Sequence, residues 1–334
     1  MNFLNDILKD IGNEHATLAA DISEDERFVD TGSFIFNALV SGSINGGLSS
    51  NKITAIAGES STGKTFFALA VVRSFLDSDP NAIAVYFDTE SAITRSLLED
   101  RGIDTSRVIV INVVTIEEFR TKALQCVDKY LKVSESDRQP MMFVLDSLGM
   151  LSTEKEIGDA LAEKNVRDMT KSQLVKGAFR MLTLKLGQAD VPLIVTNHTY
   201  DVIGSYVPTK EMGGGSGLKY AASTIIYLSK KKEKDGKEVI GNIIKAKTAK
   251  SRLSKENQEV EIRLYYDERG LDRYYGLLEL GELGGLWKNI AGRYEIDGKK
   301  LYAKQILAEP EKYFTDEVML KLDVIAQGTF SYGS

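Results

Sequence analysis

The sequence predicts an α/β fold in which a mixed, mainly parallel β-sheet forms the core, a short helical element precedes it and a small domain follows. The first observation behind this prediction is that apolar runs with strand spacing alternate with stretches of helical spacing over residues 29–271. The second is the stretch Ala-Gly-Glu-Ser-Ser-Thr-Gly-Lys-Thr at residues 57–65, which matches the phosphate-binding pattern G-x-x-x-x-G-K-[ST]. An expected strand precedes this loop and an expected helix follows it, which is the order that such a site requires.

Length and composition bound the class of protein. A chain of 334 residues with 43% hydrophobic and 27% charged residues is typical of a globular protein with one large domain and a smaller appendage, or with two domains. The net charge of −6 excludes a surface that is basic throughout. It leaves room for local basic patches that contact nucleic acid, because binding depends on where the cations lie.

The cellular location is also constrained. The single cysteine, Cys126, lies in an apolar-periodic stretch and is expected to be a buried thiol, so no disulfide can form within the chain. The start of the chain lacks a leader pattern, and no run of about 18 apolar residues occurs. We therefore expect a cytoplasmic protein, in the host cell if a phage encodes it, with no membrane partner.

Residues 1–28 are expected to hold a short helix and a linker. Phe3, Leu4 and Ile7 recur at helical spacing, and residues 21–25 are polar and acidic. The apolar side of this helix can pack on the core of its own chain or reach a neighbouring subunit, and both remain open.

Within the core, the pattern changes from parallel to antiparallel. Past residue 196 the expected strands flank Asp235-Gly236, which favours a hairpin. Helices are predicted near residues 64–77, 95–101, 116–131 and 171–189. Strands are predicted at residues 53–57, 83–87, 108–113, 141–145, 192–196, 223–229, 239–245 and 259–266.

Two segments, residues 152–170 and 200–217, match neither pattern and are predicted to be long loops. The second contains three consecutive glycines at residues 213–215. Loops of this length in a compact domain usually bind a ligand or are disordered. Residues 272–334 show helical patches without a chemical motif, and they are predicted to form a small α-rich C-terminal domain.

The glycine loop predicts a nucleoside triphosphate site. Gly58 and Gly63 let the backbone curl so that N–H groups point at phosphate oxygens, at the positive end of the following helix. Lys64 would contact the β- and γ-phosphates, and the Thr65 hydroxyl would bind Mg²⁺. The alternative is a glycine turn that matches by chance. The residues expected to cradle the nucleotide are Gly58, Glu59, Ser60, Ser61, Thr62, Gly63, Lys64 and Thr65.

Two carboxylates are expected beside this loop. Asp146 ends the apolar run at residues 141–145, where a carboxylate can help to hold Mg²⁺. Ser147 follows it, so this strand supplies no second acid. Glu90, just past the strand at residues 83–87, can orient or deprotonate water instead. The alternative for Glu90 is a solvated loop residue.

His198 and a basic run have open roles. His198 follows one strand and precedes the glycine-rich loop, so it is either structural or a sensor that passes the nucleotide state to the loop. The basic run at residues 245–252 is a solvated face, a contact for nucleic-acid phosphates, or a cation source for the γ-phosphate of a neighbouring subunit.

The ordered set of motifs resembles the RecA/RadA strand-exchange recombinases, and most closely their bacteriophage UvsX branch. The similarity runs from about residue 29 to residue 271. It lies in Val29-Asp30-Thr31-Gly32-Ser33, Asp88-Thr89-Glu90, Arg101-Gly102-Ile103-Asp104, Val144-Leu145-Asp146-Ser147-Leu148-Gly149, Arg167-Asp168-Met169-Thr170, Asn197-His198-Thr199-Tyr200 and Met212-Gly213-Gly214-Gly215-Ser216-Gly217.

This resemblance implies a RecA-like P-loop ATPase core and an ATP-dependent DNA recombinase that forms a helical filament on single-stranded DNA and pairs it with homologous duplex DNA. ATP with Mg²⁺ would lie between adjacent subunits. A single-strand-binding protein and a loader would be further partners. The implied catalytic residues are Lys64, Glu90 and His198 from one subunit and Lys250 and Arg252 from the next, with Thr65 and Asp146 at the metal.

The two long loops would line the filament axis and contact DNA. Leu97 departs from the family pattern, because a tyrosine often stacks on adenine at this place, so base selectivity is open. Two alternatives to a recombinase are a hexameric RecA-fold helicase, which usually carries a large N-terminal domain, and a non-catalytic ATP-binding paralogue or mediator. The DNA contacts that the resemblance implies are Lys164, Arg167, Lys171, Lys210, Gly213, Gly214, Gly215 and Lys219.

Overall fold

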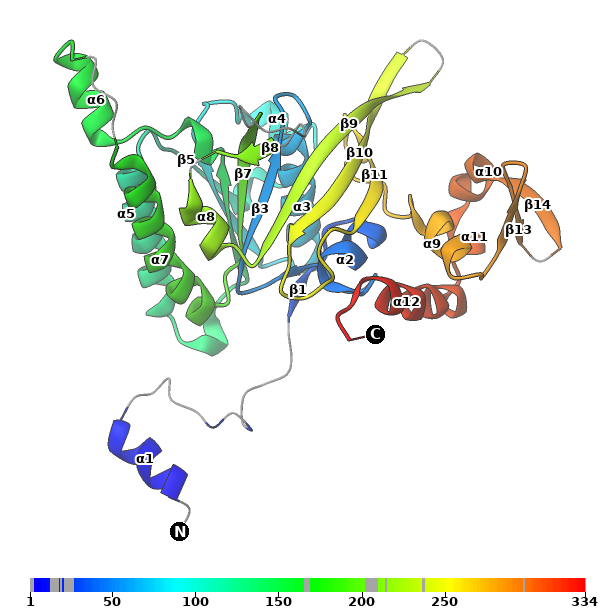
Figure 1. Cartoon of the computed structure of the whole chain (residues 1–334), viewed down its shortest axis with the longest axis horizontal. Coiled ribbons are helices and arrows are strands. Elements are labelled where there is room, and N and C mark those ends of the chain that lie inside the picture. Colours follow the sequence, from blue (N-terminus) through cyan, green and yellow to red (C-terminus); the bar gives the residue numbers. More distant parts are fainter. Residues whose placement is uncertain are drawn as a thin grey trace.

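A computed structural model describes residues 3–12, 18, 20, 27–164, 169–201, 210–213, 215–235, 238–296 and 298–333. A nine-stranded sheet forms its centre, and the C-terminal segment extends from one side of it (Figure 1). No helix in these described ranges combines the length and the apolar character that a membrane span needs.

The central sheet is mixed and mainly parallel, as the sequence predicts. Its order is β11-β10-β9-β3-β7-β6-β4-β5, and β8 pairs with β7. Strands β9, β3, β7, β6, β4 and β5 run parallel, whereas β10 and β11 are antiparallel additions. The bounds are β3 Ile53–Gly58, β4 Ile83–Asp88, β5 Val108–Asn112, β6 Met141–Asp146, β7 Leu193–Asp201, β8 Lys210–Met212, β9 Thr224–Asp235, β10 Glu238–Lys250 and β11 Glu259–Tyr265.

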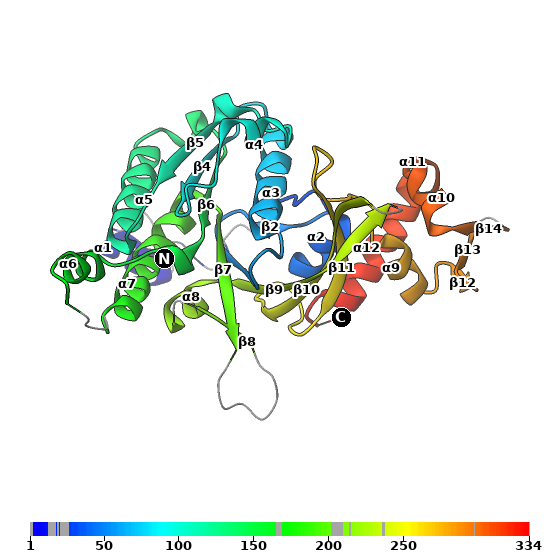
Figure 2. The same ribbon diagram turned by 90° about the horizontal axis from the view of Figure 1, so that it is seen from above.

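Helices cover both faces of this sheet (Figures 1 and 2). Successive strand residues point to opposite faces, so Tyr86 and Val144 join one buried cluster while Phe87 and Leu145 join the other. The first cluster includes residues of α2 Phe34–Ser41, α3 Lys64–Ser78 and α4 Arg95–Glu99. The second includes residues of α5 Ile116–Leu131, α7 Lys171–Ala189 and α8 Ser216–Ala221.

Short elements connect these layers. Strands β1 Phe28–Val29 and β2 Leu48–Ser49 pair antiparallel ahead of β3. The short helices are η2 Thr105–Arg107, η3 Glu135–Asp137 and η4 Leu148–Met150. Near the N-terminus, α1 Phe3–Ile11 leaves Phe3, Leu4 and Ile11 exposed, and Figure 1 shows it apart from the core.

The two predicted long loops are partly structured. Residues 154–161 form α6 Glu154–Leu161, so the loop prediction is wrong there. The physical reason is a capping box: the Thr153 hydroxyl accepts from the Glu156 N–H at 2.9 Å, and the Glu156 carboxylate accepts from the Thr153 N–H at 3.1 Å. In the second segment, β7 continues to Asp201 and pairs with β8. Residues 165–168, 202–209 and 214 lie outside the described ranges.

The C-terminal segment carries three short strands between its helices, which the prediction of a small α-rich domain did not include. A three-stranded antiparallel sheet follows α9. Its strands are only three or four residues long, too short for the sequence pattern to reveal. The elements are α9 Leu277–Leu283, β12 Lys288–Ile290, β13 Arg293–Ile296, β14 Lys299–Tyr302, α10 Ala303–Ala308, α11 Pro310–Tyr313 and α12 Asp316–Phe330.

This segment shares its hydrophobic core with the sheet. Trp287, Leu322 and Phe330 belong to the same buried cluster as α2 and α3. The Asp323 carboxylate of α12 accepts hydrogen bonds from the Ser43 hydroxyl at 2.7 Å and from the Ile44 N–H at 2.9 Å. Within the described residues, the hydrophobic core therefore continues across residue 271, near which the sequence predicts a domain boundary.

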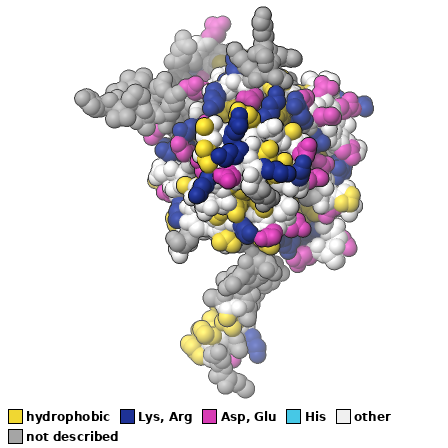
Figure 3. Space-filling view, turned by 90° about the vertical axis from the view of Figure 1, so that its right-hand side faces the viewer, with side chains coloured by type: hydrophobic (Ala, Val, Ile, Leu, Met, Phe, Trp, Pro, Cys, Tyr) yellow, Lys and Arg dark blue, Asp and Glu magenta, His cyan; other side chains and the backbone are white. Residues whose placement is uncertain are grey.

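The outer face of the C-terminal segment carries mixed charge. In Figure 3, which looks onto this side, Lys and Arg side chains gather near the centre with hydrophobic and acidic side chains between them. The exposed cations of β12 to α10 are Lys288, Arg293, Lys299, Lys300 and Lys304.

Candidate nucleotide site

The glycine loop has the backbone of a phosphate cradle. Gly63, with φ 93°, takes a conformation that L side chains rarely adopt and opens α3 as its N-cap. A Cβ at Gly58 would lie 2.8 Å from both the Leu228 carbonyl oxygen and the Thr62 hydroxyl. The N–H groups in the first turn of α3 are consequently available to an anion.

Lys64 is buried at the start of α3, with 7% of its surface exposed. Its ammonium donates to the Gly58 carbonyl at 3.0 Å and to the Glu59 carbonyl at 2.8 Å. Burial lowers the pKa of Lys64, and the neighbouring Asp146 and Glu90 act in the opposite direction. The ammonium therefore lies within the loop, where it can exchange these carbonyls for phosphate oxygens.

Asp146 and Thr65 meet, as the sequence predicts for a metal site. The Thr65 hydroxyl donates to Asp146 Oδ2 at 2.7 Å, which leaves the lone pairs of Thr65 Oγ1 for a cation. Among the described residues, no cluster of three His, Cys, Asp or Glu side chains could hold a metal by itself. A Mg²⁺ ion here would consequently need phosphate oxygens and water as further ligands.

Glu90 and His198 also come together. The Ser147 hydroxyl donates to Glu90 Oε1 at 3.2 Å, and His198 Nε2 lies 3.7 Å from the same oxygen. Asp88 fixes the turn that carries Glu90, because its carboxylate accepts from the Glu90 N–H at 3.0 Å and from the Ile93 N–H at 2.9 Å. The Glu90 residue is thus held by these contacts just past the C-terminal end of β4, and it is not an isolated loop residue.

His198 is linked to the glycine-rich segment through the backbone. The Gly213 N–H donates to the His198 carbonyl at 3.0 Å, and Asn197 Nδ2 donates to the Gly213 carbonyl at 2.8 Å. A Cβ at Gly213 would lie 2.8 Å from the Tyr200 ring. The end of β7 and the start of the glycine-rich segment are therefore joined by hydrogen bonds and close packing.

Lys250 and Arg252 have different surroundings. The Lys250 ammonium donates to the Lys219 carbonyl at 2.8 Å and the Ala222 carbonyl at 2.7 Å, so it stabilises the C-terminus of α8. Burial, followed by the charge of Arg252, lowers the pKa of Lys250. Arg252 is exposed and forms no ion pair within the described part of the chain.

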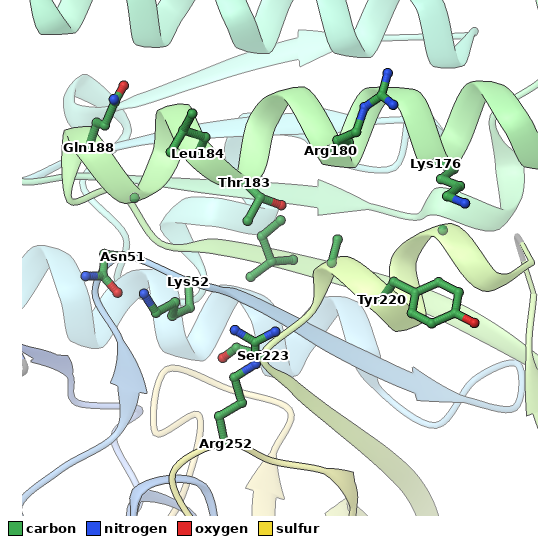
Figure 4. A pocket seen from close by; sticks show the side chains of 14 residues that line it. Asn51, Lys52, Lys176, Arg180, Thr183, Leu184, Gln188, Tyr220, Ser223 and Arg252 are labelled. Carbon is green, nitrogen blue, oxygen red and sulfur yellow. The ribbon is translucent and has the colours of Figure 1, made fainter. Parts of the chain in front are cut away.

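Arg252 lines a cavity of about 670 Å³ between α7, α8 and the start of β3. Figure 4 shows it extending toward Ser223, with Lys52 to one side and Lys176 on α7 above. Arg180 lines the same cavity. No acidic residue lines it, and these four cations have no ion-pair partner among the described residues. The surface that carries Arg252 is therefore suited to an anionic partner.

The predicted DNA contacts are distributed over both loop segments. Lys164 is exposed after α6, Lys171 begins α7 3.7 Å from Glu156, and Lys219 lies 3.4 Å from Glu211. Gly213 and Gly215 flank the start of α8. Arg167 and Gly214 lie outside the described residues, as does the side chain of Lys210.

Leu97 is partly buried. It packs against the cluster around α3 from the partly buried side of α4. Beside it, the Arg101 guanidinium lies 4.1 Å from the centroid of the Phe66 ring, and Arg101 is 8% exposed.

Residues that the sequence reasoning missed complete the site. Tyr86 and Thr196 are fully buried and both donate to Asp146. Ser147 and Asp88 also belong to the site, because both hydrogen-bond to Glu90. The available signal was a tyrosine two positions before the end of the apolar strand β4, and a threonine directly after the apolar residues of β7.

Sheet order, glycine loop and strand-end carboxylates together place the chain in the class of P-loop proteins. Comparison narrows this class, since the model of the RecA N-terminal domain matches residues 2–272, and the chain belongs to this family. A recombination and repair protein of Enterobacteria phage T4 is 35% identical over 261 residues, which is 78% of this chain and 65% of that protein. A RecA protein of Bifidobacterium breve is 27% identical over 258 residues, 77% of this chain and 62% of that protein. The chain thus spans just under two thirds of the length of these curated relatives.

Proposed function

We propose that this protein is an ATP-dependent DNA recombinase that forms filaments on single-stranded DNA and catalyses homologous pairing and strand exchange. The observation that carries the proposal is that His198 Nε2 lies 3.7 Å from Glu90 Oε1 while the His198 carbonyl accepts a hydrogen bond from the Gly213 N–H. It couples a hydrolytic carboxylate to the segment that the resemblance assigns to DNA. A relative of 35% identity, named a recombination and repair protein, supports the same reading.

The chemistry of the site is that of water activation. ATP with Mg²⁺, when bound, would supply the γ-phosphate and a Lewis acid. Ser147 and His198 both lie at Glu90 Oε1, and no donor of the described residues contacts Oε2. Oε2 is therefore the oxygen that accepts a proton from water. Lys64 would compensate the phosphate charge, with Thr65 and Asp146 on the metal side.

The proposal is tested by DNA-dependent ATP turnover and by electron microscopy with circular single-stranded DNA and a non-hydrolysable ATP analogue. We expect weak turnover without DNA, strong stimulation by single-stranded DNA, and helical filaments. Equal turnover with and without DNA contradicts the proposal. Closed rings would favour a hexameric helicase, and DNA-stimulated turnover without strand exchange would favour a paralogue or mediator.

We also propose that Arg252 acts on the nucleotide of the next subunit. Substituting Arg252 tests an intersubunit site more directly than substituting Lys250, because Lys250 also stabilises α8 and its loss has a structural effect. Arg252→Ala should abolish DNA-stimulated turnover and leave nucleotide binding intact, since a cation delivered from outside acts on transition-state charge. Lys321→Ala, an exposed cation of α12 paired with Glu317, is the matched control and should be unaffected.

Mixing two inactive variants distinguishes an intersubunit site from an intrasubunit one. In a random equimolar filament of Glu90→Gln and Arg252→Ala, about a quarter of head-to-tail interfaces combine an intact Glu90 with an intact Arg252. Partial recovery of turnover on mixing is the expected result. Absence of recovery, with filaments still visible, would place Arg252 outside the site.

A further inference from the structure

Asp146 accepts hydrogen bonds from three hydroxyl groups that come from three different elements. Oδ2 accepts from Thr65 of α3 at 2.7 Å and from Tyr86 of β4 at 2.8 Å. Oδ1 accepts from Thr196 of β7. The carboxylate is therefore held from the helix and from both neighbouring strands at once.

The two strand hydroxyls are unusual for their surroundings. On this face of the sheet, β4, β6 and β7 place Ala84, Val144 and Ile194 in the apolar cluster, all fully buried. Tyr86 and Thr196 are also fully buried, at 0% exposure. A buried hydroxyl is costly unless it has a partner, and each of these two has its partner in Asp146.

Strand register explains why both hydroxyls reach the same carboxylate. Leu145 pairs with Val195, so the residues that follow, Asp146 and Thr196, lie side by side. Tyr86 pairs with Val144 two residues earlier, and its long side chain reaches forward to Asp146. The three side chains share one face because each strand alternates.

Counting acceptor positions gives a chemical consequence. A carboxylate offers about four lone-pair positions, two on each oxygen. Both positions of Oδ2 and one of Oδ1 are occupied by hydroxyl groups. One position of Oδ1 remains, which is enough for one water molecule of a hydrated Mg²⁺ ion and too few for bidentate ligation.

We propose that Tyr86 and Thr196 are positioning residues, which orient Asp146 so that its one remaining acceptor position holds a water of the Mg²⁺ shell. This inference rests on the proposed nucleotide chemistry and concerns the same site. The two hydroxyls act through Asp146 and touch neither nucleotide nor metal. Outer partners of this kind typically change metal affinity by about 10- to 100-fold.

The Tyr86 hydroxyl is suited to act as a hydrogen-bond donor to Asp146. Burial, followed by the charge of Asp146, raises the pKa of Tyr86 well above its usual value. The hydroxyl therefore keeps its proton at neutral pH.

A purely structural role is the competing explanation. In that case Asp146 serves only to satisfy a buried tyrosine, and losing the hydroxyl would lower stability without changing the metal. Metal affinity separates the two, because a structural role does not alter it in a protein that stays folded.

The test is Mn²⁺ binding, followed by electron paramagnetic resonance, to the full chain with a non-hydrolysable ATP analogue. Tyr86→Phe and Thr196→Val should each weaken Mn²⁺ binding about tenfold. Thr196→Ser keeps the hydroxyl and should retain the wild-type affinity. Binding of the analogue in EDTA should change less than about twofold, because the hydroxyls act on the metal side of the site.

Tyr294→Phe is the matched control. Tyr294 is a buried tyrosine of the C-terminal sheet, so its hydroxyl loss tests stability without touching the site. Mn²⁺ affinity should remain that of the wild type in this variant.

Unchanged Mn²⁺ affinity in folded Tyr86→Phe and Thr196→Val overturns the proposal. If Tyr86→Phe does not fold, Thr196→Val against Thr196→Ser decides the question alone. The readout is independent of turnover: a wild type without DNA-stimulated ATP hydrolysis would refute the proposed function, while the Mn²⁺ titration would still report on the two hydroxyls.

Discussion

Among single residues, Glu90 is the carboxylate that we propose acts on water. Its turn is fixed by the Asp88 carboxylate, and its Oε1 is occupied by Ser147 and by the nearby His198. The other oxygen is left to act on water. The carboxylate is thus prepared in the protein chain before any ligand arrives.

Glu90→Gln should lower the DNA-stimulated turnover number about 10²- to 10⁴-fold, because the amide cannot accept a proton from water. Nucleotide binding should persist, since the amide keeps the size and the hydrogen bond from Ser147. Steady-state turnover and equilibrium binding of a fluorescent ATP analogue measure the two effects.

The control for this variant is Glu99→Gln. Glu99 lies on α4 and pairs with Arg95 at the surface, 2.6 Å away. Its turnover should match the wild type. If both substitutions lower turnover equally, Glu90 has no special role.

For single residues, the sequence predicts the polar side chains at strand ends and in the glycine loop, and it misses the buried side chains that hydrogen-bond to them. Thr65, Asp146 and Glu90 follow from a loop pattern and from the position where an apolar run stops. Tyr86 and Thr196 could not be predicted, because their shared partner Asp146 lies 60 and 50 residues away in the chain and is reached only through the register of β4, β6 and β7. Local pattern carries no information about that register.

Among elements, α7 and α8 pack with almost no space between their backbones. A Cβ at Gly217 would lie 2.7 Å from the Lys176 backbone nitrogen and 2.8 Å from its Cα. This close approach positions α8, which follows the glycine-rich segment and whose C-terminus Lys250 stabilises.

Gly217→Ala should lower the free energy of unfolding by about 1–3 kcal/mol, because backbone atoms already occupy the space that the new methyl group needs. Gly177→Ala, in the interior of α7 with no atom within 4 Å of the new Cβ, is the matched control. It should raise stability by about 0.5–1 kcal/mol through helix propensity. Urea denaturation of both variants measures the difference, and equal shifts of the same sign would contradict it.

Periodicity predicts α5 and α7 with their observed bounds, since long amphipathic helices carry strong signals. It misses α6, because Ile157 and Leu161 are too few large apolar residues to give a clear helical period. The sequence signal for this helix was the capping box of Thr153 and Glu156. It also ends β7 early, because residues 197–201 are polar. In the structure Asn197 and His198 continue the pairing with β3, and residues 199–201 pair with β8. Such tertiary pairing is invisible in the local sequence.

For the whole molecule, the shared hydrophobic cluster predicts that core and C-terminal segment unfold together. Leu322 of α12 is fully buried in this cluster, and the single tryptophan, Trp287, is buried beside α9 with its indole N–H donating to the Leu278 carbonyl at 2.7 Å. Trp287 fluorescence therefore reports on the junction, whereas far-ultraviolet circular dichroism reports on the whole chain.

In urea, both signals should change in one coincident transition. Leu322→Ala should shift both by about 2–5 kcal/mol, because it leaves a cavity in the common core. Leu320→Ala, on the same helix but 68% exposed, should shift neither measurably. Two separate transitions would show that the segment folds as an independent domain.

The three hydroxyls around Asp146 also constrain how this site can evolve. A descendant that loses the carboxylate first leaves Tyr86 and Thr196 buried with unpaired donors, which costs about 1–3 kcal/mol for each group. A descendant that first exchanges tyrosine for phenylalanine and threonine for an aliphatic residue keeps a folded core. Lineages that abandon the nucleotide should therefore have shed the hydroxyls before the acid, and present-day sequences should show these three positions changing together in that order.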